Sequence, residues 1–284
     1  MSNKIVLGIG EFLFDVLPGG KKAGGAPVNF AFHASKHGVR SYAISAIGDD
    51  VLGEELLDAA SSNGIKVIAP KTEYPTSTVQ VEVDGNGVPN FTICEGVAWD
   101  HIPLTAEMAD LASRADAICY GTLSQRCPDS RRTIAQLIAM AKPGALKVYD
   151  INLRQKYYSK ELISENLKLA DVLKLNDDEF VIVCGMFNLD ISKIEDSCRW
   201  LMKEFDLKTL ILTAGAVDSS IFSSDGTTSI LPTPKVNVID SVGAGDSFTG
   251  AYIASVLNGS GIRQAHEIAV QAAAEVCMKA GAWV

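Results

Sequence analysis

The stretch Asp240-Ser241-Val242-Gly243-Ala244-Gly245-Asp246-Ser247-Phe248 carries the strongest structural signal in this chain. An apolar segment ending at Ile239 predicts a strand before it, and apolar periodicity predicts a helix over 244–257. Glycines at a helix start leave backbone N–H groups bare, and the helix dipole favours an anion there, usually phosphate. The carboxylate of Asp246 would repel that anion. Its presence beside an anion site is explained if it accepts a proton from an attacking hydroxyl group. A Gly-rich turn with a capping Asp explains Gly-Ala-Gly alone, and the longer string favours the functional interpretation.

The composition excludes several classes of protein. With 284 residues, 47% of them hydrophobic, the chain can bury a sizeable core and is not disordered. Its net charge of -9 argues against a nucleic-acid or anionic-membrane partner, so any phosphate site must be local. The apolar run 5–9 is too short for a signal peptide, and no run approaches the length of a membrane span. We therefore expect a cytoplasmic protein.

The spacing of the six cysteines also favours a cytoplasmic location, where thiols stay reduced. Their positions show no Cys-x-x-Cys spacing, which favours free thiols over disulfides or a zinc site. They are residues 94, 119, 127, 184, 198 and 277.

Strand-like and helix-like segments alternate along most of the chain. This alternation predicts an α/β fold in one domain over 1–284, with a doubly wound, mostly parallel sheet between helices. Strands are predicted at 4–10, 42–47, 66–69, 117–122, 147–151, 172–175 and 209–213. Helices are predicted at 27–37, 53–62, 131–141, 160–170, 193–205, 244–257 and 263–279, and no strand is expected after the last two.

Two segments depart from this alternation. A second short strand is predicted at 12–17, and strands at 78–83 and 89–94 around Asp84-Gly85-Asn86-Gly87 predict a hairpin. Together these insertions, at about 11–23 and 72–101, predict a small β-sheet beside the main one. Such a sheet could close over a cleft as a lid, pair with another subunit, or be a decoration without function.

A second Gly-rich junction, Ala23-Gly24-Gly25-Ala26-Pro27-Val28-Asn29, begins the first predicted helix. Its glycines allow a ligand to approach the backbone, and the Asn29 amide can both donate to and accept from sugar hydroxyls. Asp15, at the end of the predicted strand 12–15, could accept two such bonds. A helix start with a buried Asn and a solvated turn Asp are the alternatives.

Other polar side chains follow predicted strands. Asn176 and Glu179 could hold Mg²⁺ through water, or could form a capping box at a helix start, and these roles are compatible. Arg154 could contact a phosphate or a sugar, or form a surface ion pair. Thr213 and Gly215 could border a nucleotide, although a plain strand exit explains them nearly as well.

Several enzyme classes do not fit. Leu13 stands where a dinucleotide fingerprint needs its third glycine, and no Walker motif or Gly-x-Ser-x-Gly elbow occurs. Val270 stands where a zincin helix needs its second histidine.

Together these segments resemble the ribokinase-like (phosphofructokinase B) family of sugar kinases. The signatures are Gly24-Gly25-Ala26-Pro27-Val28-Asn29 and Asp240-Ser241-Val242-Gly243-Ala244-Gly245-Asp246, and the resemblance covers essentially the whole chain. Within the family the chain looks most like bacterial fructokinases, on the stretches 10–15, 92–101, 121–126, 150–158 and 174–179.

This resemblance implies ATP-dependent phosphorylation of a sugar's primary hydroxyl group. It implies that Asp246 is the catalytic base, with the amides of Gly243, Ala244 and Gly245 as the anion hole. It assigns Asp15, Gly25 and Asn29 to the sugar and Asn176 and Glu179 to Mg²⁺ and phosphate. A monovalent cation such as K⁺ often binds near the segment that starts at Asp240.

Two departures from the family pattern matter. Val242 replaces a usual threonine and can contribute only its backbone, and Asp218 replaces a glycine of the nucleotide loop. The second departure puts phosphate or ribose contacts of that loop in doubt. We expect a fructokinase that converts ATP and D-fructose to ADP and fructose 6-phosphate, with a possible homodimer through the lid sheet. The alternatives are a kinase of another sugar or sugar acid, such as ribose or 2-keto-3-deoxygluconate, and a silent sugar-binding protein.

Overall fold

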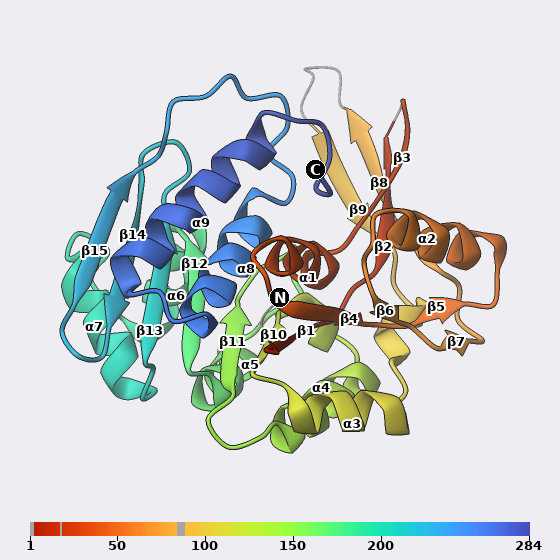
Figure 1. Cartoon of the computed structure of the whole chain (residues 1–284), viewed down its shortest axis with the longest axis horizontal. Coiled ribbons are helices and arrows are strands. Elements are labelled where there is room, and N and C mark those ends of the chain that lie inside the picture. Colours follow the sequence, from red (N-terminus) through yellow and green to blue (C-terminus); the bar gives the residue numbers. More distant parts are fainter. Residues whose placement is uncertain (1–2, 18, 84–88) are drawn as a thin grey trace.

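A large sheet forms the centre of the molecule (Figure 1). Among the residues that the computed structural model describes, which are 3–17, 19–83 and 89–284, this sheet has nine strands in the order β15-β14-β13-β12-β11-β10-β1-β4-β6. Neighbours from β6 to β13 are parallel, whereas β14 and β15 are antiparallel. The strands are β1 (Ile5–Ile9), β4 (Arg40–Ile44), β6 (Val67–Ile68), β10 (Ala117–Tyr120), β11 (Leu146–Asp150), β12 (Val172–Asn176), β13 (Thr209–Thr213), β14 (Asp218–Ser223) and β15 (Thr228–Pro232).

Helices cover both faces of this sheet because its strands are apolar on both sides. Leu7 of β1 belongs to a buried cluster with α3 to α7, and its neighbour Val6 belongs to a second cluster with α1, α8 and α9. The predicted doubly wound α/β architecture is therefore confirmed. The helices are α1 (Ala26–Lys36), α2 (Val51–Ser62), α3 (Ala106–Arg114), α4 (Pro128–Met140), α5 (Lys160–Leu169), α6 (Asp177–Phe187), α7 (Ile194–Glu204), α8 (Ala244–Leu257) and α9 (Ile262–Cys277).

The strand order reverses at β1. From β1 the chain builds β4 and β6 on one side, and then β10 to β13 on the other. In open α/β sheets, ligands bind beyond the carboxyl ends of the strands at such a switch point. The segments that follow β1, β10 and β11 therefore surround the expected cleft.

The predicted small sheet is present and projects from the main one (Figure 1). Its strand order is β3-β2-β8-β9, with β2 and β8 parallel and both outer pairs antiparallel. These strands are β2 (Leu13–Leu17), β3 (Gly20–Gly24), β8 (Ser77–Val83) and β9 (Pro89–Ile93). The predicted turn around Gly85-Asn86-Gly87 lies outside the described residues. Two short strands, β5 (Ile47–Gly48) and β7 (Lys71–Thr72), pair separately.

The prediction of a strand ending at Ile239 is wrong. Residues 233–243 have no strand, and the side chains of Val238 and Ile239 are 61% and 64% exposed. Their β-branched chains look strand-like, but no neighbouring strand pairs with them. The edge of the sheet is instead completed by β14, which is rich in serine, and by β15, and neither was predicted as a strand.

Two other features agree with the sequence. All six cysteines are free, three of them buried (Cys119, Cys184 and Cys198) and three half-buried. Among the described residues, none of the helices combines the length and the apolar character that crossing a membrane requires.

A buried ion pair joins the small sheet to the main body. After β9 the chain forms a short 3₁₀ helix, η1 (Ala98–His101), and a second one, η2 (Leu123–Gln125), precedes α4. Arg126 makes two hydrogen bonds to the Asp100 carboxylate, at 2.7 and 2.9 Å, and both side chains are at least 94% buried. The guanidinium group also lies 4.1 Å from the centre of the Trp99 ring. Because a buried charge needs its partner, this pair constrains the return of the chain from the small sheet.

We expect Arg126→Ala to lower the free energy of unfolding by about 3–5 kcal/mol, because it leaves the Asp100 carboxylate buried without a counter-charge. Arg263→Ala is the control: Arg263 pairs with Glu267 on the surface of α9, so the loss should be small. Urea unfolding of both variants measures the difference. Equal stabilities would show that the buried pair contributes nothing.

Candidate active site

Close packing of α1 against α8 positions the predicted catalytic carboxylate. A Cβ atom added to Gly250 of α8 would lie 2.7 Å from the Phe30 carbonyl oxygen, so the two backbones are in direct contact. One turn before Gly250 on α8, and one residue before Phe30 on α1, the side-chain Nδ2 of Asn29 donates to Asp246 Oδ2 at 2.8 Å. Two side chains that are 217 residues apart in sequence thereby meet.

A donor on the other side fixes the Asn29 amide. The indole Nε1 of Trp283 donates to Asn29 Oδ1 at 2.8 Å. Because an indole N–H can only donate, the Asn29 oxygen must face Trp283 and its NH₂ group must face Asp246. The segment that holds Trp283 is itself anchored, since the Ala282 carbonyl oxygen lies 2.8 Å from the ring nitrogen Nε2 of His33.

The start of α8 has the conformation expected of an anion site. Gly243 has a positive φ of 81°, and a Cβ atom there would lie 2.6 Å from the Cβ of Ala282. The first N–H groups of a helix have no intrahelical acceptor and are free to bind an anion. The Ala244 N–H, however, donates to the Ser241 carbonyl oxygen at 3.2 Å, which leaves Gly243 and Gly245 as the better donors of the predicted three.

A buried ammonium group lies directly beneath this turn. A Cβ atom on Gly245 would lie 3.0 Å from the Nζ of Lys174, and Lys174 is only 6% exposed. Burial lowers the pKa of Lys174, but the charges of Asp150, Glu179 and Asp246 outweigh it and hold the pKa above its usual value. Lys174 therefore stays charged and adds positive potential where the helix dipole already favours an anion.

Asp150 holds Lys174 in place. One oxygen of the Asp150 carboxylate accepts from Lys174 Nζ at 3.1 Å, and the other accepts from Thr249 Oγ1 at 3.0 Å. Since Thr249 lies on α8, the ion pair also connects β11 and β12 to the helix that holds Asp246.

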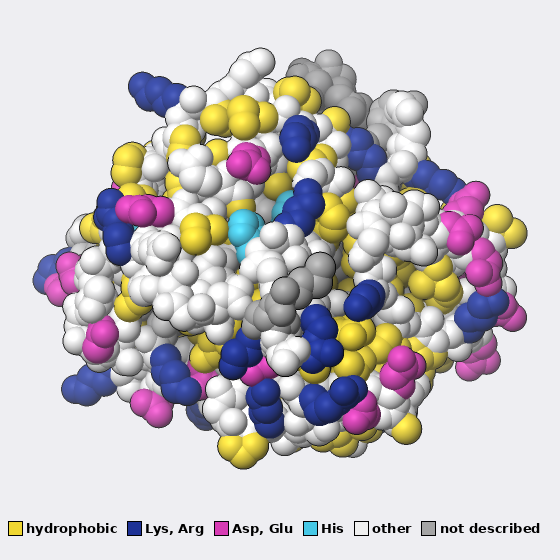
Figure 2. All heavy atoms as spheres, viewed as in Figure 1, with side chains coloured by type: hydrophobic (Ala, Val, Ile, Leu, Met, Phe, Trp, Pro, Cys, Tyr) yellow, Lys and Arg dark blue, Asp and Glu magenta, His cyan; other side chains and the backbone are white. Residues whose placement is uncertain are grey.

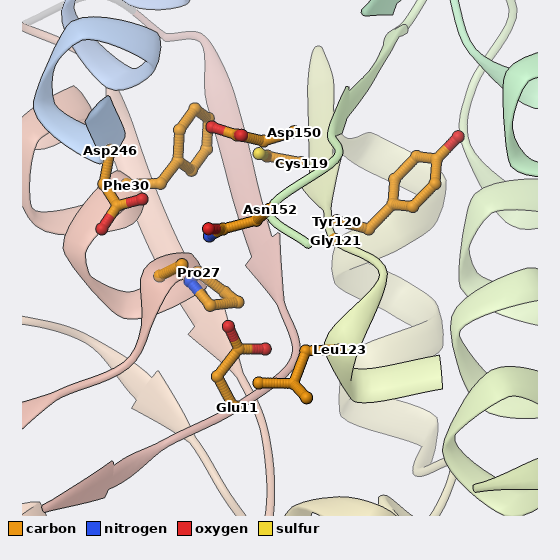
Figure 3. A pocket seen from close by; sticks show the side chains of 11 residues that line it. Glu11, Pro27, Phe30, Cys119, Tyr120, Gly121, Leu123, Asp150, Asn152 and Asp246 are labelled. Atoms are coloured by element: carbon orange, nitrogen blue, oxygen red, sulfur yellow. The ribbon is translucent and has the colours of Figure 1, made fainter. Parts of the chain in front are cut away.

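A small cavity lies between these groups (Figure 3). Glu11, Asn152, Asp150 and Asp246 contribute its polar side chains, and Pro27, Phe30 and Leu123 contribute apolar ones. The space in it that the centre of a water molecule can occupy is about 10 Å³, which is room for one water molecule. This cavity alone is therefore too small to hold a sugar.

Burial shifts the pKa values of two carboxyl groups at this cavity. It raises the pKa of Asp246 to about 6, with a further increase from the Asp150 charge, while the Asn29 hydrogen bond acts in the opposite direction. It raises the pKa of Glu11 to about 7, and the Glu11 Oε2 atom is buried without a hydrogen-bond partner. Carboxyl groups with pKa values near neutrality in a cavity are typical of acid–base sites.

None of the predicted sugar residues lines this cavity, but most of them lie near a residue that does. Asp15 lies on β2 opposite Lys22, and burial raises its pKa. The charge of Arg154 lowers the pKa values of Glu11, Asp15 and Asp246, so it lies close to all three. Gly25 is the N-cap of α1, and a Cβ there would lie 2.2 Å from the Glu11 carbonyl oxygen, which leaves room for glycine alone.

Asn176 and Glu179 form the predicted capping box at the start of α6. Asn176 Oδ1 accepts from the Glu179 N–H at 2.8 Å, and Glu179 Oε2 accepts from the Asn176 N–H at 2.9 Å. Glu179 Oε1 also accepts from the Leu153 N–H at 2.8 Å. Thr213 lies opposite Asn176 at the carboxyl end of β13, and Gly215 follows in the turn to β14.

Asp240 has partners within the chain. Its carboxylate accepts from Lys22 Nζ and from the N–H groups of Val242 and Gly281, each at 3.0 Å. Binding of K⁺ near Asp240 stays a prediction, and an ammonium group already neutralises this carboxylate.

Sequence reasoning did not assign Glu11, Asn152, Lys174 or Trp283 to the site. Glu11 and Lys174 gave a usable signal, since each is a charged residue in or directly after an otherwise apolar strand. Trp283 gave none, because only the tertiary fold brings it to Asn29.

Comparison with known proteins identifies the family. The family model described as pfkB family carbohydrate kinase matches residues 18–283. The chain belongs to this family. The pfkB kinase is 31% identical to fructokinase-2 of Oryza sativa over 274 residues, which cover 89% of this chain and 80% of the rice protein. It is 28% identical to the fructokinase of Escherichia coli over 269 residues, covering 89% of this chain and 84% of that protein.

A solved structure of a sugar kinase is also similar to this chain. The structure of an uncharacterized sugar kinase from Pyrococcus horikoshii in complex with ATP superposes with a TM-score of 0.82 at 26% identity, covering 98% of this chain and 94% of that one. The pfkB kinase is therefore a phosphotransferase with a carbohydrate kinase fold.

The hydrogen bonds around Asn29 generate a prediction for this kinase. Trp283→Phe keeps the aromatic ring but removes the donor that orients the Asn29 amide, which then flips freely and weakens its bond to Asp246. That bond lowers the pKa of Asp246, so weakening it should raise this pKa. The acid limb of the plot of kcat/KM against pH should then move to higher pH by about 0.5–1 unit. The control is Trp200→Phe on the surface of α7. Superimposable profiles for wild type and Trp283→Phe would contradict the prediction.

Proposed function

We propose that this kinase transfers the γ-phosphoryl group of ATP to the primary hydroxyl group of D-fructose, giving fructose 6-phosphate and ADP. The observation that carries the proposal is the Asp246 carboxyl group, with a pKa of about 6, at the start of α8 and at the edge of the cavity. Relatives named fructokinase support the choice of sugar.

Asp246 acts as the general base. Its carboxylate accepts the proton of the sugar hydroxyl as the sugar oxygen bonds to the γ-phosphorus. The bond between that phosphorus and the bridging oxygen breaks, and ADP leaves with the electron pair. A pKa near 6 keeps Asp246 ionised at neutral pH yet basic enough to accept the proton.

The anion hole stabilises the transferring group. The amides of Gly243, Ala244 and Gly245 face the phosphoryl oxygens in this proposal, with Lys174 supplying positive charge from beneath. The positive φ at Gly243 and the close approach of Lys174 to Gly245 support it, because side chains at these positions would distort the turn.

Residues at the carboxyl ends of β12 and β13 bind the nucleotide. Thr213 and Gly215 border it, and Asn176 and Glu179 hold Mg²⁺ through water. They fit this ion because each Glu179 oxygen accepts one hydrogen bond from the described residues and retains a lone pair, and oxygen is the ligand that Mg²⁺ prefers. When bound, Mg²⁺ neutralises charge on the phosphates.

Asp15, Gly25, Asn29 and Arg154 bind the sugar, with Glu11 as an additional contact. The unpartnered Oε2 of Glu11 supports this role, because a sugar hydroxyl could satisfy it. One observation favours a second candidate substrate. The cation of Arg154 lies near the carboxyl groups beside this cavity, so a sugar acid could place its carboxylate against it.

The small sheet acts as a lid on a single domain of residues 1–284 and excludes water during transfer. Its outer strands β3 and β9 offer free edges within the described residues, and either could pair with a second copy in a homodimer. We place the enzyme in the cytoplasm, where ATP and reduced thiols occur together.

A coupled assay of ADP release tests the substrate, with D-fructose, ribose, 2-keto-3-deoxygluconate and other sugars, with and without Mg²⁺ and K⁺. We expect the highest kcat/KM with D-fructose and no activity without Mg²⁺. A higher value with a sugar acid would replace fructose by the second candidate. No ADP release with any sugar would leave a silent binding protein.

Asp246→Asn tests the base. We expect kcat to fall about 10²–10⁴-fold with a modest change in sugar KM. In the wild type, kcat/KM should fall tenfold per pH unit below about pH 6, because protonated Asp246 cannot accept a proton. Near-full turnover in the variant would remove Asp246 from this role.

We also expect Asp246→Asn to change the stability of the protein. A carboxyl group whose pKa is raised on folding destabilises the folded state once it ionises. The uncharged side chain of Asp246→Asn should therefore stabilise the protein by about 1–3 kcal/mol above pH 6. The gain should vanish as the pH falls toward 4, where both side chains are neutral. Unfolding at pH 8 and pH 4 measures it, and a loss of stability at pH 8 would contradict it.

A further inference from the structure

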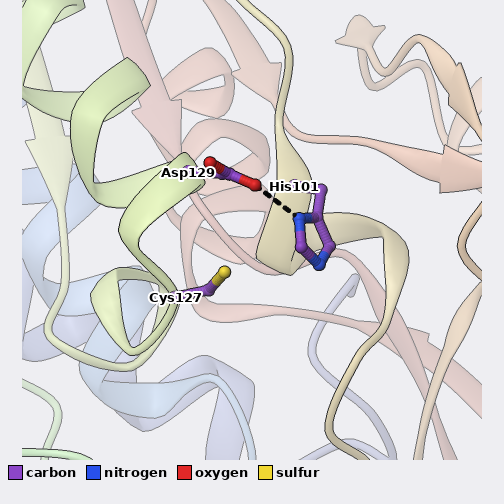
Figure 4. A group of neighbouring side chains, drawn as sticks. All are labelled: His101, Cys127 and Asp129. Atoms are coloured by element: carbon purple, nitrogen blue, oxygen red, sulfur yellow. Dashed lines mark hydrogen bonds and ion pairs between the residues drawn. The ribbon is translucent and has the colours of Figure 1, made fainter.

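Three side chains with metal-binding atoms lie together away from the proposed active site (Figure 4). They are His101 at the end of η1, Cys127 at the N-cap of α4, and Asp129 in its first turn. One ligand atom from each lies within 4.8 Å of the other two, and all three residues are half-buried. The three ligand atoms are therefore neighbours, and the cluster is open to solvent.

The imidazole of His101 is held in position on both sides. Its ring stacks on Tyr74 with 3.6 Å between the ring centres and 9° between the planes. Its Nδ1 lies 2.8 Å from Asp129 Oδ2, so the two atoms share a proton. A metal ion can take the place of that proton and retain both ligands.

The backbone that bears these ligands is also fixed. Ser130 Oγ accepts from the Ile102 N–H at 2.9 Å and donates to the Trp99 carbonyl oxygen at 2.8 Å. Thr133 Oγ1 donates to the Ile102 carbonyl oxygen at 2.7 Å. Since these buried bonds flank His101, η1 cannot drift away from the start of α4, and little ordering is needed on binding.

The donor set selects the metal. A thiolate, an imidazole nitrogen and a carboxylate oxygen form a borderline-soft set that suits Zn²⁺ and not Mg²⁺ or Ca²⁺. Three protein ligands leave the fourth tetrahedral position for water. The remaining carboxylate oxygen of Asp129 keeps its 2.7 Å bond to Arg132, which orients it from behind as outer-shell partners do.

We propose that His101, Cys127 and Asp129 bind one Zn²⁺ ion. The Cys127 thiol proton is released, and the ion replaces the proton between His101 Nδ1 and Asp129 while the neutral imidazole carries its one proton on Nε2. The lack of Cys-x-x-Cys spacing in the sequence argues against a zinc site. The proposed site does not need that spacing, because its ligands come from two segments and include a single cysteine. The ion links η1, which follows lid strand β9, to α4 in the main body. The site does not depend on the proposed substrate.

Metal binding to the full chain in excess Mg²⁺ tests the site. Titration with Co²⁺, a spectroscopic substitute for Zn²⁺, should produce a sulfur-to-cobalt charge-transfer band that saturates at one ion per chain and is displaced by Zn²⁺. Cys127→Ser should abolish the band, and His101→Ala should weaken Zn²⁺ affinity at least about tenfold. Cys277→Ser, which changes another half-buried cysteine, is the control and should retain both.

Thermal unfolding provides a second readout that does not depend on the spectrum. Zn²⁺ should raise the Tm of the wild type and of Cys277→Ser, and should leave that of Cys127→Ser unchanged. Unfolding of each variant without metal shows whether it still folds. A band or a Tm increase that persists in Cys127→Ser, or the lack of both in the wild type, would overturn the proposal.

Discussion

The backbone contact between α1 and α8 is the constraint on which the site depends. Gly250 allows the two helices to approach until no side chain fits between them, and this approach sets the 2.8 Å bond between Asn29 and Asp246. Each helix begins at one of the two Gly-rich junctions that the sequence analysis singled out. The parts of the chain that are proposed to face the sugar and the phosphate are therefore aligned by helix packing and not by loops.

The site concentrates charge that folding alone would not favour. Glu11, Asp150 and Asp246 lie around a cavity with room for one water molecule, and burial raises the pKa values of Glu11 and Asp246. Lys174 offsets part of this charge from within the core. Such an arrangement reduces the stability of the fold, as active sites usually do, and in the proposed function it gives the base a useful pKa.

Much of this arrangement could be predicted from the sequence, because it depends on local patterns. Alternating apolar segments predicted the sheet and its helices, and the glycines predicted both helix starts. The missed features depend on tertiary neighbours. Val238 and Ile239 have strand-like side chains but no strand beside them, whereas serine-rich β14 pairs because β13 offers it an edge, and β15 then pairs with β14. Likewise, nothing near Trp283 in the sequence indicates its bond to Asn29.

The residues around the cavity come from two kinds of structure. Asp246 and Asn29 lie on packed helices, whereas Asn152 and Arg154 lie on the irregular segment between β11 and α5, where Asn152 has a positive φ of 46°. Loops accept substitutions and insertions more readily than packed helices. Under the proposed function, substitutions in residues 151–159 would change which sugar is recognised and leave the phosphoryl chemistry of α1 and α8 intact.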